Sequence, residues 1–212
     1  MIHKFYLFLI LILLFSGCNN ESNHTENNIS LKKIKIVTLD STQKKIYTIK
    51  EEPPKEYTFI FEDLQQQKAK ITMKNDIYNF SNITQPIVMV TLFASWCPPC
   101  RGQIPHLTNL QKKFKKHLFI LGALVYDDRE KEALNRFIIS EQALFFISVN
   151  QKENLKFANM ITPKLRLKKD FPMPLMILFF KGKYFTHYEG SMPEEMIQSD
   201  IEQLLIKIKK GQ

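Results

Sequence analysis

The stretch that decides the fold of this chain is Ile87-Val88-Met89-Val90-Thr91-Leu92-Phe93-Ala94-Ser95-Trp96-Cys97-Pro98-Pro99-Cys100. Its first part, Ile87 to Ala94, is an apolar run with the length and composition of a buried strand. The residues that follow, 101–114, have the pattern of a helix. The two cysteines are therefore expected at the junction between a buried strand and a helix.

The position of Cys97 at such a junction favours thiol chemistry. The free N–H groups of a helix N-terminus and the positive end of its dipole favour a thiolate. A thiolate is the species that attacks a disulfide, and such positions lower the pKa of a cysteine from about 8.5 to roughly 3.5–7.5. Cys100 lies within reach of Cys97, so the pair can open and close as a redox disulfide.

Metal binding is the main alternative for a Cys-x-x-Cys pair, because the same spacing forms half of many zinc sites. Zinc needs a second pair of ligands, and the sequence has only one further cysteine, Cys18. The five histidines have no paired spacing; they are His3, His24, His106, His117 and His187. We therefore expect redox chemistry at Cys97 and Cys100, with no metal site and no cofactor.

The N-terminus, residues 1–17, has the pattern of a targeting segment. A short positive start precedes Phe5 to Phe15, an apolar stretch typical of a signal peptide and too short to span a membrane. Phe15-Ser16-Gly17-Cys18 resembles a bacterial lipobox, which implies lipidation of Cys18; an uncleaved membrane anchor is the alternative. Either interpretation predicts an exported domain held at a membrane, in an oxidising compartment.

Residues 18–30 have the composition of a flexible polar leash, and residues 31–56 have the pattern of a small β extension. About 180 residues follow the leash, which is the length of one domain. The formal charge of +9 comes mostly from scattered lysines, which predicts a solvated surface with some attraction to anionic lipid. Nucleic acid is not an expected partner, since the domain is exported and carries no recognition motif.

From residue 57 onward the patterns of strand and helix alternate. Strands are predicted at 57–61, 69–73, 87–94, 118–124, 144–149, 175–180 and 184–188, and helices at 101–114, 128–142, 151–161 and 193–208. Alternation of this kind indicates an α/β fold with a mixed central sheet and helices on both faces.

At two places the sequence resembles the thioredoxin superfamily, and within it the exported TlpA/ResA-like thiol–disulfide proteins. The first place is Leu92 to Arg101. The second is Met173 to Lys183, which looks like the cis-proline strand and hairpin of the family. The resemblance covers about Tyr57 to Ile206 and implies a thioredoxin-like domain over residues 57–212.

The resemblance also implies a role for each residue of the site. Cys97 would be the attacking thiolate, and Cys100 the buried resolving thiol. Trp96 would shield one side of the site. Pro174, in a cis peptide bond, would lie against the disulfide, and the backbone of Met173 would line a substrate groove.

The chain departs from the family at two positions. Many thioredoxins carry a buried acid where Thr91 stands, and reductases of the ResA type carry a glutamate where Gln103 stands. Those carboxylates help to move the proton of the resolving cysteine, so Cys100 has no base that the sequence identifies. We expect Gln103 either to face the active site or to be a solvent-facing helix residue.

Pro98 and Pro99 bear on the direction of the redox reaction. Neither has an N–H group, so neither can donate a hydrogen bond to a Cys97 thiolate. A thiolate with fewer donors is less stable, and this favours a reducing protein over a strongly oxidising one.

The sequence therefore predicts an extracytoplasmic, membrane-tethered thiol–disulfide oxidoreductase that reduces disulfides of exported proteins. Apocytochrome c is the substrate class that the resemblance implies. The other partners would be a membrane thiol donor that recycles the disulfide, and lipid through Cys18. Two alternatives stay open: a Cu(I)-handling lipoprotein that uses Cys97 and Cys100, since soft thiolates suit that ion, and an oxidant that introduces disulfides.

Overall fold

The computed structural model describes residues 55–168 and 170–211. The expected signal peptide at 1–17, the lipidation site Cys18 and the leash to residue 30 lie outside these ranges. So does almost all of the expected β extension at 31–56. Within the described ranges, no helix combines the length and the apolar character needed to cross a membrane.

The centre of the fold is a mixed sheet of eight strands in the order β1-β2-β3-β8-β7-β4-β5-β6. The strands are β1 (Glu56–Glu62), β2 (Lys68–Lys74), β3 (Ile77–Ser81), β4 (Ile87–Phe93), β5 (Leu118–Leu124), β6 (Phe146–Ser148), β7 (Leu175–Phe180) and β8 (Lys183–Glu189). The helices of the described part are α2 (Pro98–Lys113), α3 (Lys131–Ser140), α4 (Gln151–Lys164) and α5 (Glu194–Lys209). Strand β4 runs parallel to β5 and antiparallel to β7. This is the predicted α/β, thioredoxin-like architecture.

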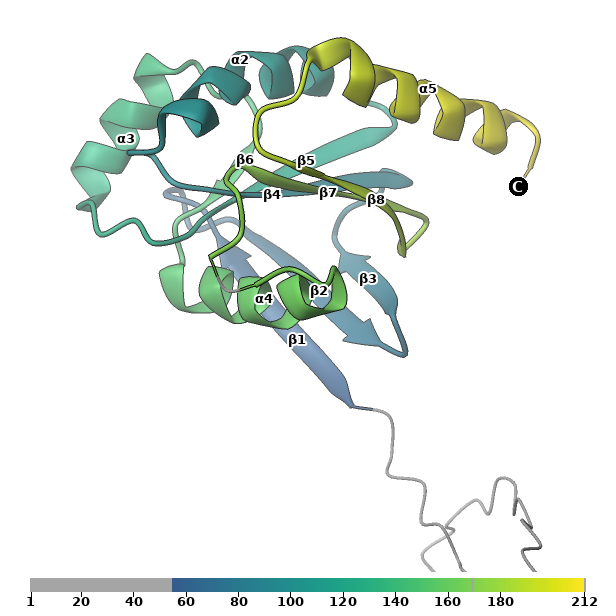
Figure 1. Cartoon of the computed structure of the whole chain (residues 1–212), viewed down its shortest axis with the longest axis horizontal. Helices are drawn as coiled ribbons and strands as arrows, with labels where there is room; N and C mark the ends of the chain where they lie inside the picture. The colour runs from purple at the N-terminus through teal and green to yellow at the C-terminus, as the bar shows by residue number, and fades with distance from the viewer. Residues whose placement is uncertain (1–54, 169, 212) are drawn as a thin grey trace, which may run out of the picture. The chain divides into compact units, whose positions relative to one another are not determined.

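Helices cover both faces of the sheet, as Figure 1 shows with α2 and α5 on one side and α4 on the other. Every residue of β4 is buried, and its side chains alternate between the two faces. Ile87 and Met89 pack into the cluster that includes buried residues of α2 and α5. Val88 and Val90 pack into the cluster formed with α4 and the β1–β2 strands. A strand buried on both faces explains the continuous apolar run in the sequence.

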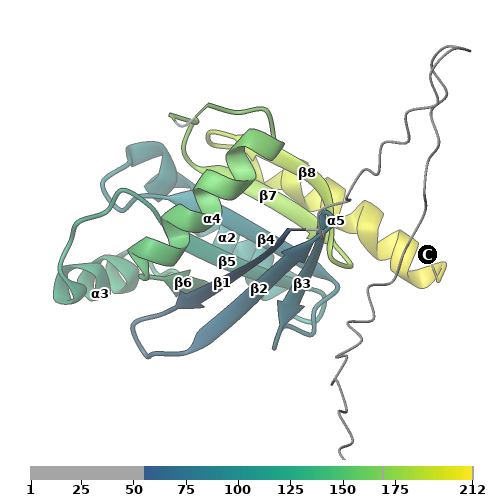
Figure 2. The ribbon, with the colours of Figure 1, turned by 90° about the horizontal axis from the view of Figure 1, so that it is seen from below.

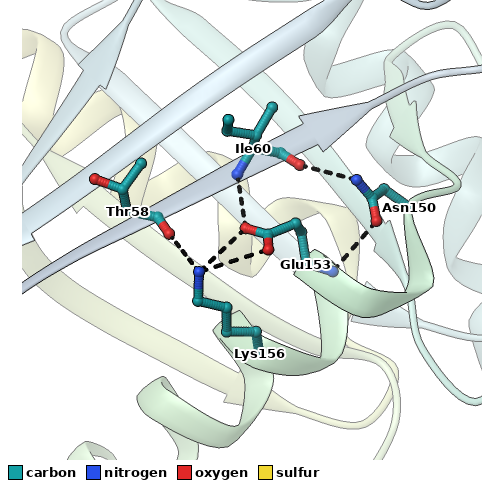
Figure 3. A network of polar contacts seen from close by, with 5 residues as sticks. All are labelled: Thr58, Ile60, Asn150, Glu153 and Lys156. Atoms are coloured by element: carbon teal, nitrogen blue, oxygen red, sulfur yellow. Dashed lines mark hydrogen bonds and ion pairs between the residues drawn. The ribbon is translucent and has the colours of Figure 1, made fainter.

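Polar side chains of α4 fasten this helix to the edge strand β1, beside which it lies (Figures 2 and 3). Glu153 accepts a hydrogen bond from the backbone N–H of Ile60 at 3.1 Å. Lys156 donates to the backbone carbonyl of Thr58 at 2.8 Å, and Asn150 donates to that of Ile60 at 3.4 Å. Because β1 is an edge strand, these bonds occupy backbone groups that would otherwise be open to pairing with another chain.

Two buried tyrosines join other elements of the sheet. Tyr188 on β8 donates a hydrogen bond to Asp200 on α5 at 2.6 Å; burial, and then Asp200, raise the pKa of this phenol. Tyr78 on β3 packs its ring 4.6 Å from that of Phe179 on β7. Burial and the nearby Asp76 raise the pKa of Tyr78 to about 12.

One strand was not predicted, and several elements have other bounds than predicted; α2 begins earlier, at Pro98, and α4 ends later, at Lys164. Strand β3 was not predicted, because its sequence is short and interrupted by Asn79. Helix α3 is shorter than the predicted 128–142, since Asp128 to Glu130 form a loop before it. Strand β6 is shorter than the predicted 144–149, because Leu144 is exposed and lies before the strand.

Candidate active site

The two cysteines lie where the sequence predicts, at the junction of β4 and α2. Cys97 is the N-cap of α2, and its sulfur accepts a hydrogen bond from the backbone N–H of Cys100 at 3.4 Å. A disulfide joins Cys97 to Cys100. Cys97 is 5% exposed and Cys100 only 1%, so the first sulfur is the more accessible of the two.

The prolines between the cysteines occupy the first two positions of α2. A helix tolerates proline there because those N–H groups have no partner within the helix. Neither proline can donate to the sulfur of Cys97, which leaves the N–H of Cys100 as the hydrogen-bond donor that the described structure gives it. The first turn of α2 contains no acidic residue.

The peptide bond between Met173 and Pro174 is cis, as expected. It brings the backbone carbonyl oxygen of Met173 to 3.9 Å from the sulfur of Cys97. The carbonyl of Pro174 accepts a hydrogen bond from the N–H of Gly190 at 2.9 Å. The segment 173–174, distant in sequence, is therefore fixed beside the disulfide.

An apolar cleft adjoins the disulfide. It has a volume of about 470 Å³ and is lined by Trp96, Tyr126, Asp170, Phe171 and Met173. Trp96 is 52% exposed, and its indole N–H donates to the backbone carbonyl of Tyr126 at 2.7 Å. Tyr126 itself has a positive φ of 55°, which is rare for a bulky residue.

Gln103 does not face solvent, so that alternative is wrong. Its side chain is 1% exposed. The amide nitrogen donates to the carbonyl oxygen of Met192 at 3.1 Å, and the amide oxygen accepts from the N–H of the same residue at 2.8 Å. Both ends of the side chain are therefore used to hold the loop that precedes α5 against α2.

Thr91 is fully buried on β4, and its hydroxyl has no hydrogen-bond partner within the described ranges. A buried acid does lie near the loop that carries Cys97, but in the segment that follows the neighbouring strand β5. Asp127 follows β5, is 2% exposed, and accepts a hydrogen bond from the backbone N–H of Ser95 at 2.6 Å. Asp127 is not among the site residues that the sequence predicted.

A signal for Asp127 was present in the sequence. It follows the apolar strand 118–124 closely, and β5 runs parallel to β4. The carboxyl ends of neighbouring parallel strands meet at one edge of a sheet, so a polar residue after β5 lies close to the loop after β4. In the part of the chain that the structure describes, no three His, Cys, Asp or Glu side chains gather closely enough to hold a metal ion.

Comparison with known proteins identifies the family. A family model described as Redoxin matches residues 63–203. One similar structure is a protein assigned as the thiol:disulfide interchange protein DsbE from Chlorobium tepidum; the identity is 23%, the TM-score 0.52, and the match covers 73% of this chain and 98% of that one. No curated protein matches the sequence.

Two further structures have the same fold. One is a thioredoxin family protein from Chlorobium tepidum TLS, a thiol:disulfide interchange protein, with 14% identity, a TM-score of 0.55, and coverage of 73% of this chain and 97% of that one. The other is a secreted Mycobacterium tuberculosis disulfide oxidoreductase, with 12% identity, a TM-score of 0.50, and coverage of 68% and 95%.

The family match spans most of the chain and includes the Cys97–Cys100 disulfide, so the chain belongs to the Redoxin family. The protein is an enzyme with a thioredoxin-like fold, a thiol–disulfide oxidoreductase that acts on cysteine-containing substrates.

Proposed function

We propose that this enzyme is a TlpA/ResA-like lipoprotein outside the cytoplasm that reduces disulfides of exported proteins. The observation that carries the proposal is the placement of the Cys97 sulfur. It lies at the N-terminus of α2, 3.9 Å from the Met173 carbonyl oxygen, and next to an apolar cleft. A polypeptide lying along the segment 173–174 would present its disulfide to this sulfur.

The reaction follows from the two sulfurs. In the reduced enzyme the Cys97 thiolate attacks one sulfur of the substrate disulfide, and the other substrate sulfur leaves as a thiolate that takes up a proton. The Cys100 thiol then loses its proton and attacks the Cys97 sulfur. This step forms the Cys97–Cys100 disulfide and releases the second substrate thiol. Two electrons pass from enzyme to substrate, and a membrane thiol donor would return them.

The direction of electron flow depends on how strongly the Cys97 thiolate is stabilised. Strong oxidants of this fold are oxidising because their reduced form is stabilised. Here Pro98 and Pro99 provide no N–H donors, and the N–H of Cys100 stands at 3.4 Å from the sulfur. A weakly stabilised thiolate supports a reducing enzyme.

The cleft supports a polypeptide substrate. Its lining is apolar except for Asp170, and apolar side chains are exposed in proteins that have not yet folded. Apocytochrome c before haem attachment is the substrate class implied by the resemblance of 92–101 and 173–183 to the TlpA/ResA-like proteins. The lipobox-like sequence ending at Cys18 supports a lipid anchor, and the secreted relative from Mycobacterium tuberculosis has the same fold.

Trapping of mixed disulfides tests this proposal. In a full-length Cys100→Ala variant the resolving thiol is absent, so exported proteins with cysteines should accumulate in disulfide linkage to Cys97. The matched Cys97→Ala variant should trap none. Trapping by Cys97→Ala instead would reverse the roles of the two cysteines, and no trapping by either variant would contradict the proposed substrates.

The anchor is tested separately by fractionation. The wild-type chain, expressed from its own N-terminus, should be found with membranes, and a Cys18→Ser variant should lose lipid labelling. Incorporation of labelled fatty acid into Cys18→Ser would contradict lipidation at this residue.

A further inference from the structure

Asp127 is a buried acid to which the chemistry described above gives no role. It is 2% exposed, and one carboxylate oxygen accepts a hydrogen bond from the N–H of Ser95 at 2.6 Å. Ser95 precedes Cys97 by two residues. The carboxylate thus binds the backbone of the loop that carries the reactive sulfur.

One of the two carboxylate oxygens of Asp127 has no hydrogen-bond partner among the described residues. Its Oδ1 atom is buried and makes no hydrogen bond within the described ranges, and the same holds for the hydroxyl of Ser95. None of the ion pairs found among the described residues includes Asp127; they involve other acids, such as Glu141 with Arg101. Burying a carboxylate that is only partly satisfied by hydrogen bonds is costly, and a redox role is one explanation for such a group in a native protein.

Neighbouring contacts hold Asp127 in place. The carbonyl of Tyr126 accepts from the Trp96 indole at 2.7 Å, and the carbonyl of Asp127 accepts from the side chain of Gln151 on α4 at 2.7 Å. The residue pair 126–127 is therefore fixed to the active-site loop on one side and to α4 on the other. These backbone contacts keep the carboxyl group of Asp127 beside the loop that carries Cys97.

We propose that Asp127 is a positioning residue whose buried negative charge disfavours a second negative charge on the Cys97 sulfur, and so makes the Cys97–Cys100 pair more reducing. Like charges in a buried region repel strongly, because little water screens them. Destabilising the thiolate destabilises the reduced pair, and the equilibrium shifts toward the disulfide. This inference rests on the proposed function and deepens it, since it names a further group, besides Pro98 and Pro99, that favours electron flow from the enzyme to its substrate.

The test is a comparison of Asp127→Asn with Asp128→Asn. Both variants remove one negative charge, but Asp128 is exposed whereas Asp127 is buried. Asparagine keeps the size of the side chain and an oxygen that can accept from Ser95. The equilibrium of each variant with glutathione or dithiothreitol buffers gives its reduction potential, and the rate of alkylation of Cys97 against pH reports its thiolate.

We expect Asp127→Asn to shift the dithiol–disulfide equilibrium about tenfold toward the reduced form, which corresponds to about 30 mV. Alkylation of Cys97 should extend to lower pH. Asp128→Asn should change the equilibrium less than about twofold, because water screens an exposed charge. Equal effects of the two variants, or loss of stability in Asp127→Asn without any shift of potential, would overturn the proposal.

A measurement on the wild-type protein covers the case in which Asp127→Asn does not fold. The carbon-13 shift of the Asp127 carboxyl group should differ between the oxidised and reduced proteins by more than that of Asp128; equal changes would overturn the proposal. The proposed function is judged separately. A wild-type potential as high as that of a strong oxidant would contradict it, whereas the effect of Asp127 is read from the difference between variants.

Discussion

Gln103 illustrates how one side chain can fix two elements. Its amide donates to and accepts from the backbone of Met192. Ser191, next to it, donates to the carbonyl of Pro99 at 3.0 Å. The loop before α5 is therefore tied to the first turns of α2, the helix that begins after Cys97. A glutamate at this position could accept from the N–H of Met192, but in its ionised form it could not donate to the carbonyl.

A Gln103→Glu variant should therefore lose stability at neutral pH. We expect the free energy of unfolding to fall by about 1–3 kcal/mol, because the Met192 carbonyl loses its donor and faces a charged oxygen. The loss should shrink as the pH falls and the new carboxyl group becomes protonated. Chemical denaturation at several pH values measures both effects.

Gln111 supplies a positive control, a second glutamine for which the same change is expected to have the same effect. It makes the same two-bond pattern at the other end of α2, donating to the carbonyl of Leu118 and accepting from the N–H of Ile120. Gln111→Glu should show a similar pH-dependent loss. If Gln103→Glu is as stable as the wild type at neutral pH, the account of the Met192 contact is wrong.

Tyr126 is the residue through which the cleft can be tested. Tyr126→Asn removes the ring but keeps a residue type that tolerates a positive φ. The backbone carbonyl that binds Trp96 is retained. Reduction of oxidised insulin, a polypeptide disulfide, should slow by about tenfold, as for the loss of one aromatic anchor. Reduction of oxidised glutathione, which has no aromatic or aliphatic side chain to place in the cleft, should not change.

Tyr184 on β8 is the control for this prediction, since it is 44% exposed against 45% for Tyr126. Tyr184→Asn should leave both reactions unchanged. An equal slowing of glutathione and insulin reduction by Tyr126→Asn would mean that the ring affects the sulfur chemistry and not substrate binding.

Among the secondary-structure elements, helix α4 holds the ends of β5 and β6 in place through one buried side chain, Asn154. Asn154 of α4 is fully buried. Its side-chain nitrogen donates to the carbonyls of Leu124 at 2.8 Å and Ser148 at 3.0 Å, and its oxygen accepts from the Ser148 hydroxyl at 2.7 Å. These bonds fix the end of β5, from which the chain continues to Tyr126 and Asp127.

Asn154→Ala should be strongly destabilising. It leaves three polar groups without their partner in a buried site, and we expect a loss of about 2–4 kcal/mol in the free energy of unfolding. Asn109→Ala is the control, because Asn109 is exposed and its side chain donates to Glu194 at the surface; its loss should stay below about 1 kcal/mol. Denaturant titrations of both variants measure the free energy of unfolding. Equal losses in the two variants would contradict the claim that the buried hydrogen bonds of Asn154 stabilise the fold.

The elements that local pattern specifies could be predicted from the sequence. Strands β4, β5 and β7 are continuous apolar runs, and the cysteine pair marks the start of α2. Strand β3 was missed, although the turn before it contains Asn75 and Asp76, which both have positive φ. These residue types are typical of a tight hairpin, and this signal was available.

Contacts between distant residues could not be predicted in the same way. Asp127 binds a backbone group 32 residues away, and Gln103 binds one 89 residues away. No local pattern encodes the contact of Gln103 with Met192. For Asp127, the position after an apolar strand indicates a place near the end of β4, but not which backbone group it binds. The sequence therefore identified the reacting cysteines and, through the family resemblance, the cis-proline segment 173–174 beside them. It did not identify Asp127 or the backbone partner of Gln103.

At the scale of the whole described domain, the strands β1 to β3 extend the central sheet at β8. Only Ile77 and Lys183 form a paired register position between β3 and β8 in the described part. The rings of Tyr78 and Phe80 pack on Phe179 and add an apolar contact to this junction. The disulfide follows β4, which β7 separates from β8, and the Cys97 sulfur lies 3.9 Å from the carbonyl oxygen of Met173.

The reduction potential of the Cys97–Cys100 pair shows whether the enzyme can act as a reductant of disulfides in exported proteins. Trp96 is the only tryptophan of the chain and adjoins Cys97, so its fluorescence should report the fraction of disulfide at each glutathione or dithiothreitol ratio. We expect a reduction potential near that of thioredoxin, about −270 mV, because the Cys97 thiolate is weakly stabilised. A potential at or above about −180 mV, in the range of protein disulfide isomerase and DsbA, would contradict this expectation.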